Sequence, residues 1–193
     1  SPPPRDPARR RWEPRAMRHG TYRFTDGLEY IQFYYPDEKG ESVRWRGTPG
    51  KYQQENPMAD KKREKYKQYS LNVETFATLG EPTDTVIKPD DKGLDVEYLT
   101  HPNELYAGES GKFRVLYDGK PLADARVRYA KDGLRYREHG FTELKSDKSG
   151  NFTIDWPGPG MYWLSVEYET TSDLAKDAPL THEYIAGLEV LPL

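Results

Sequence analysis

The sequence predicts an all-β protein whose larger part is an antiparallel β-sandwich of the immunoglobulin or transthyretin type. Short runs of alternating apolar and polar residues recur along residues 104–168, and turn signals separate them. Phe113, Val115 and Tyr117, for example, fall on one face of an expected strand, which stops at an Asp-Gly dipeptide at 118–119. The 16 glycines and 16 prolines also argue against a mainly helical chain.

Seven strands are expected between residues 94 and 193, and that number in about 100 residues is typical of an immunoglobulin-like sandwich. A polar loop at 172–179 precedes the last strand. The expected strands are 95–100, 110–117, 125–130, 141–146, 151–156, 160–169 and 181–192.

The chain before this sandwich divides into two parts. Residues 1–19 are rich in proline and arginine, with little to bury, so we expect an extended or disordered tail. This tail is either a basic arm for an acidic partner or an ordinary terminus. Residues 20–93 are expected to form a smaller, incomplete β-region, and the turn-rich segment 88–93 marks its boundary with the 94–193 sandwich.

Within the smaller region, the Asp26-Gly27 dipeptide predicts a hairpin turn between two short strands. The polar stretch 48–68 is either a solvated loop or contains a short helix capped by Asp60. Gly20-Thr-Tyr22 resembles Gly160-Met-Tyr162, which suggests the closing strands of a sandwich whose opening strands are absent. The strands expected here are 20–24, 28–35, 42–46 and 69–79.

Composition narrows the class of protein. Hydrophobic residues make up only 35% of the chain, so its 15 tyrosines and 4 tryptophans must supply much of the core. The net charge of −3 gives no general attraction to nucleic acid, and no apolar run reaches the roughly 18 residues of a membrane helix. No cysteine is present to form disulfides. Because no initiator methionine or signal peptide is present, we expect a mature or truncated product.

No catalytic motif is found in the sequence. It has no GxSxG, GxGxxG or Walker pattern, and its four histidines lack HExxH spacing. We therefore expect a protein that is not an enzyme.

One candidate metal site begins at His101, in a Thr-His-Pro-Asn-Glu segment that follows an expected strand. Glu104 lies three residues further on, and imidazole with carboxylate oxygen suits nickel, cobalt, iron or zinc. Folding could bring His139 or His182 to the same place. The alternative is that His101 only forms a hydrogen bond within its own turn.

Two cation–aromatic clusters are candidates for binding an anionic ligand. Arginine beside an aromatic ring can hold a carboxylate or phosphate while it stacks. The same alternation also describes an exposed strand face, so both interpretations stay open. The clusters are Arg44, Trp45 and Arg46, and Arg135, Tyr136 and Arg137.

Several longer blocks resemble one known family. They are Glu74-Thr-Phe76, Gly80-Glu-Pro-Thr83, the segment 100–108, Asp118-Gly-Lys-Pro-Leu122, Gly150-Asn-Phe152 and Trp156-Pro-Gly-Pro-Gly-Met-Tyr-Trp163, with Arg44-Trp-Arg-Gly47 and Arg135-Tyr-Arg137. Together they resemble the DUF4198 family, often labelled NikM-like or nickel-uptake substrate-specific components, over about residues 20–193. The N-terminal part of the family pattern, which begins with a histidine, is not matched, so the chain is expected to be a truncated or divergent member.

The resemblance implies an exported, periplasmic protein associated with a TonB-dependent receptor or an inner-membrane transport component. We therefore expect a non-catalytic binding or accessory protein for the uptake of a transition metal or metal chelate, without nucleic-acid binding or direct membrane insertion. The alternative is a structural or adhesive β-sandwich subunit of a cell-surface or extracellular assembly, because an incomplete sandwich leaves a strand edge to pair.

Overall fold

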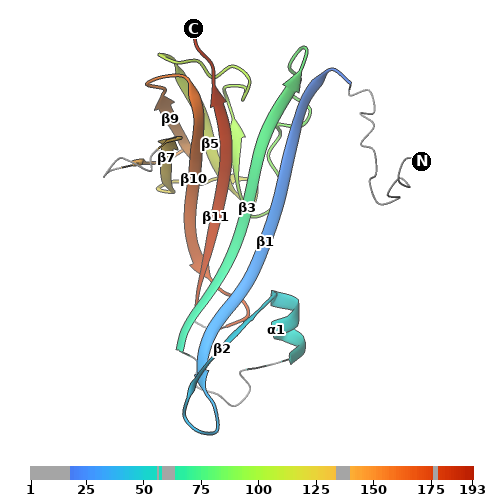
Figure 1. Ribbon diagram of the computed structural model, residues 1–193, viewed down its shortest axis with the longest axis vertical. Helices are drawn as coiled ribbons and strands as arrows, with labels where there is room; N and C mark the ends of the chain where they lie inside the picture. The colour runs from blue at the N-terminus through green and yellow to red at the C-terminus, as the bar shows by residue number, and fades with distance from the viewer. Residues whose placement is uncertain (1–17, 56, 58–63, 134–139, 176–177) are drawn as a thin grey trace, which may run out of the picture.

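The protein folds into two β-sheets, in a computed structural model that describes residues 18–55, 57, 64–133, 140–175 and 178–193. A seven-stranded sheet has the order β2-β1-β3-β11-β10-β7-β8, and a four-stranded sheet packs against part of it (Figure 1). In the smaller sheet β5 pairs with β4 on one side and with β9 and β6 on the other. The prediction of an all-β sandwich is therefore confirmed.

The strands of the larger sheet are β1 (Gly20–Pro36), β2 (Ser42–Gly47), β3 (Glu64–Leu79), β7 (Arg126–Lys131), β8 (Thr142–Lys145), β10 (Gly160–Thr171) and β11 (Pro179–Val190). Those of the smaller sheet are β4 (Leu94–Tyr98), β5 (Ser110–Tyr117), β6 (Lys120–Pro121) and β9 (Asn151–Asp155), and one helix, α1, spans Pro49–Glu55. All seven strands expected after residue 93 are present, with ends shifted by a few residues.

The expected hairpin at Asp26-Gly27 is wrong. Residues 20–36 form one continuous strand, in which Asp26 is paired with Val73 and Gly27 with Asn72 of β3. An unbroken antiparallel ladder along β3 satisfies more backbone groups than a short hairpin could, so the long-range pairing overrides the local turn preference.

The expected helix after Asp60 is also not seen where the chain is described. Residues 58–63 lie outside the described residues, and Glu64 already begins β3. The helix forms earlier, where Pro49 follows Thr48. The Thr48 hydroxyl accepts a hydrogen bond from the Lys51 N–H at 3.2 Å, which is the usual N-cap contact, and proline suits the first helical position.

Strands from both sides of the expected boundary at 88–93 lie in one sheet. β3 runs parallel to β11, and the pairing extends from Gln68 with Leu180 at one end to Thr75 with Gly187 at the other. The long strands β1 and β3 thus extend the sheet of the C-terminal region beyond the area that the smaller sheet covers (Figure 1).

Two apolar clusters hold the sheets in place. The larger lies between the two sheets and contains Phe113, Trp156 and Leu164, none more than 1% exposed. Each such side chain contributes about 2 kcal/mol by leaving water. The smaller cluster lies on the part of β1, β2 and β3 that the smaller sheet does not cover. In it, Phe33 and Tyr66 pack against Tyr52 of α1.

Candidate functional site

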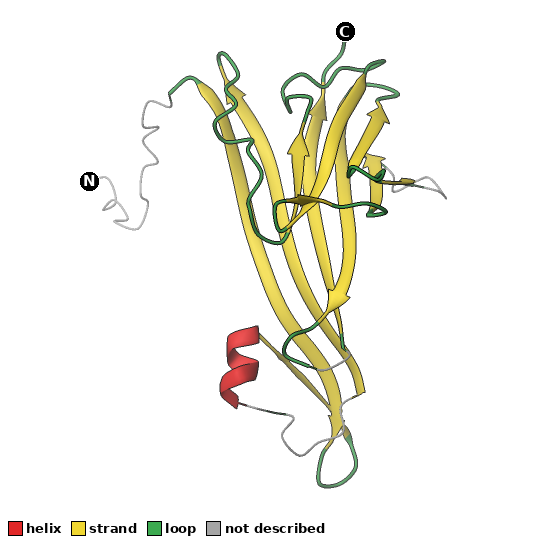
Figure 2. Ribbon diagram, turned by 180° about the vertical axis from the view of Figure 1, so that it is seen from behind, coloured by secondary structure: helices red, strands yellow, loops and turns green. Residues whose placement is uncertain are grey.

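A cavity of about 540 Å³ lies between the 80–93 linker and the end of β4. The linker is the long loop that runs back from the end of β3 in Figure 2. Five of its residues carry ionisable side chains, and three of these are carboxylates. The lining residues are Glu81, Pro82, Asp84, Ile87, Tyr98, Leu99, His101 and Glu104. The structure therefore brings the predicted pair, His101 and Glu104, together with two acidic residues of the linker.

His101 is buried, and both of its ring nitrogens have protein neighbours. The Asn103 N–H donates to Nδ1 at 3.0 Å, so Nδ1 carries no proton. Nε2 then holds the proton and lies 3.4 Å from both the Thr83 carbonyl and the Thr21 hydroxyl. The Glu104 N–H donates to the His101 carbonyl at 2.8 Å. The turn hydrogen bonds that the sequence offered as the alternative role of His101 are thus present.

The described residues contain no group of three or more His, Cys, Asp or Glu side chains placed to hold a metal ion. His182 does not join His101, because its Nε2 lies 3.0 Å from the Thr170 hydroxyl and 3.3 Å from Tyr117. His139 lies outside the described residues. Within the described part, the cavity offers hydrogen-bonding carboxylates without a preformed coordination shell.

The linker wall of the cavity is anchored by Arg23 of β1. Its Nη1 donates to the Lys88 carbonyl at 3.2 Å, and its Nη2 lies 3.4 Å from Asp95 and 3.5 Å from Asp90. Asp95 also accepts the Asp90 N–H at 2.7 Å. Arg23 and Asp95 together fix the end of the linker against β4.

The same arginine forms an ion pair with Glu74 of β3, which is only 3% exposed. Glu74 also accepts a hydrogen bond from the Tyr184 hydroxyl, which lies 2.7 Å from the hydroxyl of Tyr98. Burial raises the pKa of the Glu74 and Asp95 carboxyls, against the opposing effects of the hydrogen bonds they accept and of Arg23. We call Arg23, Glu74 and Asp95 the buried ionic cluster; it contains two carboxylates and one guanidinium.

The sequence reasoning missed this cluster, although a signal for it existed. Glu74 lies on the same, inward face of β3 as Asn72 and Phe76, which are two residues away on either side. Arg23 is paired with Phe76 and therefore lies on the same face of β1. A charged residue at an inward position of a strand predicts a buried partner.

The Arg44–Trp45–Arg46 cluster divides between the two faces of β2. Trp45 faces the smaller apolar cluster, where its ring stacks on Phe33 with centroids 5.3 Å apart. The two arginines face the other way and are exposed, and Arg46 lies 4.3 Å above the ring of Tyr30. The three side chains therefore do not converge on one ligand. Residues 135–137, the second predicted cluster, lie outside the described residues.

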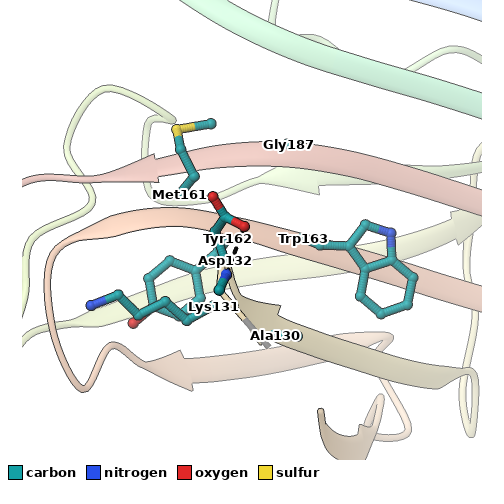
Figure 3. Close-up of a pocket in the computed structure, with 8 residues that line it drawn as sticks. Ala130, Lys131, Asp132, Met161, Tyr162, Trp163 and Gly187 are labelled. Atoms are coloured by element: carbon teal, nitrogen blue, oxygen red, sulfur yellow. Dashed lines mark hydrogen bonds between the residues drawn. The ribbon is translucent and has the colours of Figure 1, made fainter. Parts of the chain in front are cut away.

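A second cavity of about 540 Å³ opens on the opposite face of the larger sheet, beside Trp163 (Figure 3). Trp163 pairs with Gly187, which has no side chain to fill the space next to the indole. Its lining is mainly apolar: Ala130, Lys131, Asp132, Gly133, Met161, Tyr162, Trp163 and Gly187. No residue of this cavity was singled out as a site from the sequence.

The fold and the first cavity define a two-sheet β-sandwich protein with an acidic recess at the rim of the sandwich. A family model described as a domain of unknown function, DUF4198, matches residues 9–170. The chain therefore belongs to the DUF4198 family, as its sequence blocks predicted. No curated protein matches the chain. Among the described residues, no helix is long and apolar enough to cross a membrane.

Proposed function

We propose that this protein is a periplasmic, non-catalytic binding protein for transition-metal uptake, and that it takes the metal as a hydrated or chelated cation. The observation that carries the proposal is the acidic cavity, in which Glu81, Asp84 and Glu104 surround a space of about 540 Å³. That volume lies within the usual range of small-ligand pockets and exceeds the needs of a bare ion.

The arrangement of donors favours recognition through hydrogen bonds. His101 already uses its ring nitrogens within the protein, and the described residues offer no three convergent ligands. Carboxylates can instead accept hydrogen bonds from metal-bound water or amines. All three are exposed, so each attracts a cation at about 4 Å by about 1 kcal/mol, the value for charges in water.

The compartment and partners follow from the resemblance to NikM-like, nickel-uptake components. We propose that the protein acts in the periplasm and that its partner is a TonB-dependent receptor or an inner-membrane transport component. Nickel, cobalt, iron and zinc remain the candidate metals.

Calorimetric titration with aqueous Ni²⁺ and with hexaamminecobalt(III) tests the proposal. The cobalt complex keeps its six ammonia ligands, so it can bind only through hydrogen bonds and charge. We expect both cations to bind, and Glu104→Gln or Asp84→Asn to weaken each by about three- to tenfold through the loss of one attractive charge.

Glu38→Gln is the matched control, because Glu38 is an exposed carboxylate in the turn between β1 and β2. This variant should bind like the wild type. If neither cation gave a binding signal, the proposed function would be refuted. Binding of Ni²⁺ without binding of the cobalt complex would mean direct coordination and would refute the hydrated or chelated form.

A further inference from the structure

Half of strand β1 is an open sheet edge. β1 pairs with β3 along its length, but β2 covers its other side only from Ile31 to Pro36. Among the described residues, no strand pairs with the stretch 20–30 on that side (Figure 1). An open edge of this length is a template for another strand.

The hydrogen bonds along this edge show that its backbone groups lack strand partners. The Thr21 N–H points to this side, since it donates to Thr83 and not to β3, and the direction of backbone groups alternates along a strand, so the other odd-numbered residues of β1 point the same way. The Gly27 N–H donates at 3.0 Å to the carboxylate of its own neighbour, Asp26. The Thr21 N–H uses the Thr83 hydroxyl at 3.0 Å. The first is a local substitute for a neighbouring strand, whereas the second comes from the 80–93 linker, which covers the edge at Thr21 and leaves residues 22–30 open.

The outer face of the sheet, which the smaller sheet does not cover, is apolar near this edge. Four of the eight exposed large hydrophobic side chains in the described chain occupy outward positions of β1 and its neighbour β3: Phe24, Leu28, Val73 and Leu79. Phe24 and Leu28 are 53% and 47% exposed and flank the middle of the open edge. An apolar edge of this kind favours association.

We infer that residues 22–30 of β1 pair antiparallel with the same residues of a second copy of this chain, about a two-fold axis at Asp26, since β2 covers this side of β1 from Ile31 onward. The sequence of the edge is self-complementary in this register. On the outer face, Phe24 lies opposite Leu28 of the second copy, and Tyr22 lies opposite its Tyr30. Apolar and aromatic pairs directly across two strands stabilise their pairing.

The inner face of the edge fits the same register. Arg23 lies opposite Glu29 of the second copy, so no like charges face one another there, although the Arg23 guanidinium itself is held by Glu74 and Asp95. Thr25 lies opposite Gly27, and these odd-numbered residues are the ones whose backbone groups point outward to bond the new strand. Moving the axis by one residue would place Phe24 opposite Asp26 or Asp26 opposite Leu28, so those registers pair charge with an apolar side chain.

This register contains one unfavourable contact, so it predicts that one substitution strengthens the dimer. The two copies of Asp26 would lie directly opposite each other, and like charges in this position destabilise strand pairing. Asp26→Asn removes the repulsion and keeps the acceptor for the Gly27 N–H. This variant is expected to tighten the dimer about two- to fivefold in sedimentation equilibrium.

Cysteine cross-linking tests the register, because the chain has no cysteine of its own. Only residue 26 meets itself at the axis, and facing residues are about 4.5 to 5.5 Å apart at Cα, within disulfide range. Asp26→Cys is expected to form a disulfide dimer on oxidation. Phe24→Cys and Leu28→Cys are each expected to stay monomeric on gels, whereas an equimolar mixture of the two forms a mixed dimer.

Two exposed substitutions separate edge pairing from stacking of the outer faces. Leu28→Lys is expected to weaken dimerisation about tenfold, since it disrupts two symmetric contacts, whereas Met161→Lys, on the exposed face of β10 and away from the edge, leaves it unchanged. A monomer at all concentrations, no cross-link from Asp26→Cys, equal cross-linking of all single variants, or equal loss from both lysine variants would each overturn the inference. This dimer does not depend on cation binding, and it would be the first step of the structural assembly considered from the sequence.

Discussion

Removing Arg23 should destabilise the fold more than removing either of its buried partners. The guanidinium is the only cation in the buried ionic cluster, between Glu74 and Asp95, whose side chains are 1% and 2% exposed. Arg23→Leu leaves two buried carboxylates without their counterion. Breaking a buried ion pair from one side costs about 3 to 5 kcal/mol, so we expect a loss of about 3 to 5 kcal/mol in the free energy of unfolding at pH 7.5.

Glu74→Gln is the matched comparison, because it keeps the shape and one oxygen acceptor for Tyr184. Arg23 then still has Asp95 at 3.4 Å, so no charge is left unpaired. We expect a smaller loss, about 1 to 2 kcal/mol. Arg23→Leu is expected to lose more stability than Glu74→Gln because the cluster has two carboxylates and only one guanidinium.

Acidification should restore part of the stability of Arg23→Leu. Burial raises the pKa of Glu74 and Asp95 above the unfolded value, and Arg23 opposes that rise. For a carboxyl whose folded pKa is raised, stability is highest below the unfolded pKa and falls as pH rises through the folded pKa. Without Arg23 the rise is larger, so the variant should be more stable at pH 5.5 than at pH 7.5 relative to the wild type.

Urea unfolding followed by tryptophan fluorescence at both pH values measures these differences. Glu38→Gln serves as a surface control and should stay within about 0.5 kcal/mol of the wild type. A loss below about 1 kcal/mol for Arg23→Leu, a larger loss for Glu74→Gln, or a further loss of Arg23→Leu stability on acidification would refute the reasoning about the cluster.

Three further outcomes follow from local geometry. Gly150→Ala should cost about 2 kcal/mol or more, since the residue has φ +78° and an added Cβ would lie 2.6 Å from the Val115 carbonyl oxygen; unchanged urea unfolding would contradict this. Trp45→Ala should cost about 2 kcal/mol by opening the smaller apolar cluster, whereas Arg44→Ala on the exposed face should change stability by less than about 0.5 kcal/mol; equal effects would be inconsistent with the assigned faces. His101→Ala should lower the free energy of unfolding by about 1 kcal/mol through loss of its turn hydrogen bonds, and an unchanged melting temperature would count against that role.

The C-terminal strands could be predicted because residues that favour tight turns mark where they end. Asp118 and Gly119 both adopt positive φ, as an Asp-Gly hairpin turn requires, and β5 and β6 meet there. Asp26 and Gly27 carry the same signal, yet β3 provides a partner along the whole of β1. A single sequence does not reveal that partner in advance.

The site was only half predictable for the same reason. His101 and Glu104 are neighbours in sequence, so their proximity could be expected. Glu81 and Asp84 join them because the linker folds back over β4, and Arg23 holds the linker through contacts 65 and 72 residues away in the chain. Alternation would have separated Trp45 from Arg44 and Arg46, since neighbouring residues of a strand face opposite sides.

The most direct test of the central claim is a map of cation binding by ¹H–¹⁵N NMR, with hexaamminecobalt(III) added to the wild type and to Glu104→Gln. We expect shifts that concentrate at Glu81, Asp84 and Glu104 in the wild type and a weaker titration of the same positions in the variant. Shifts scattered over other acidic surfaces, or the same titration in both proteins, would contradict binding in this cavity.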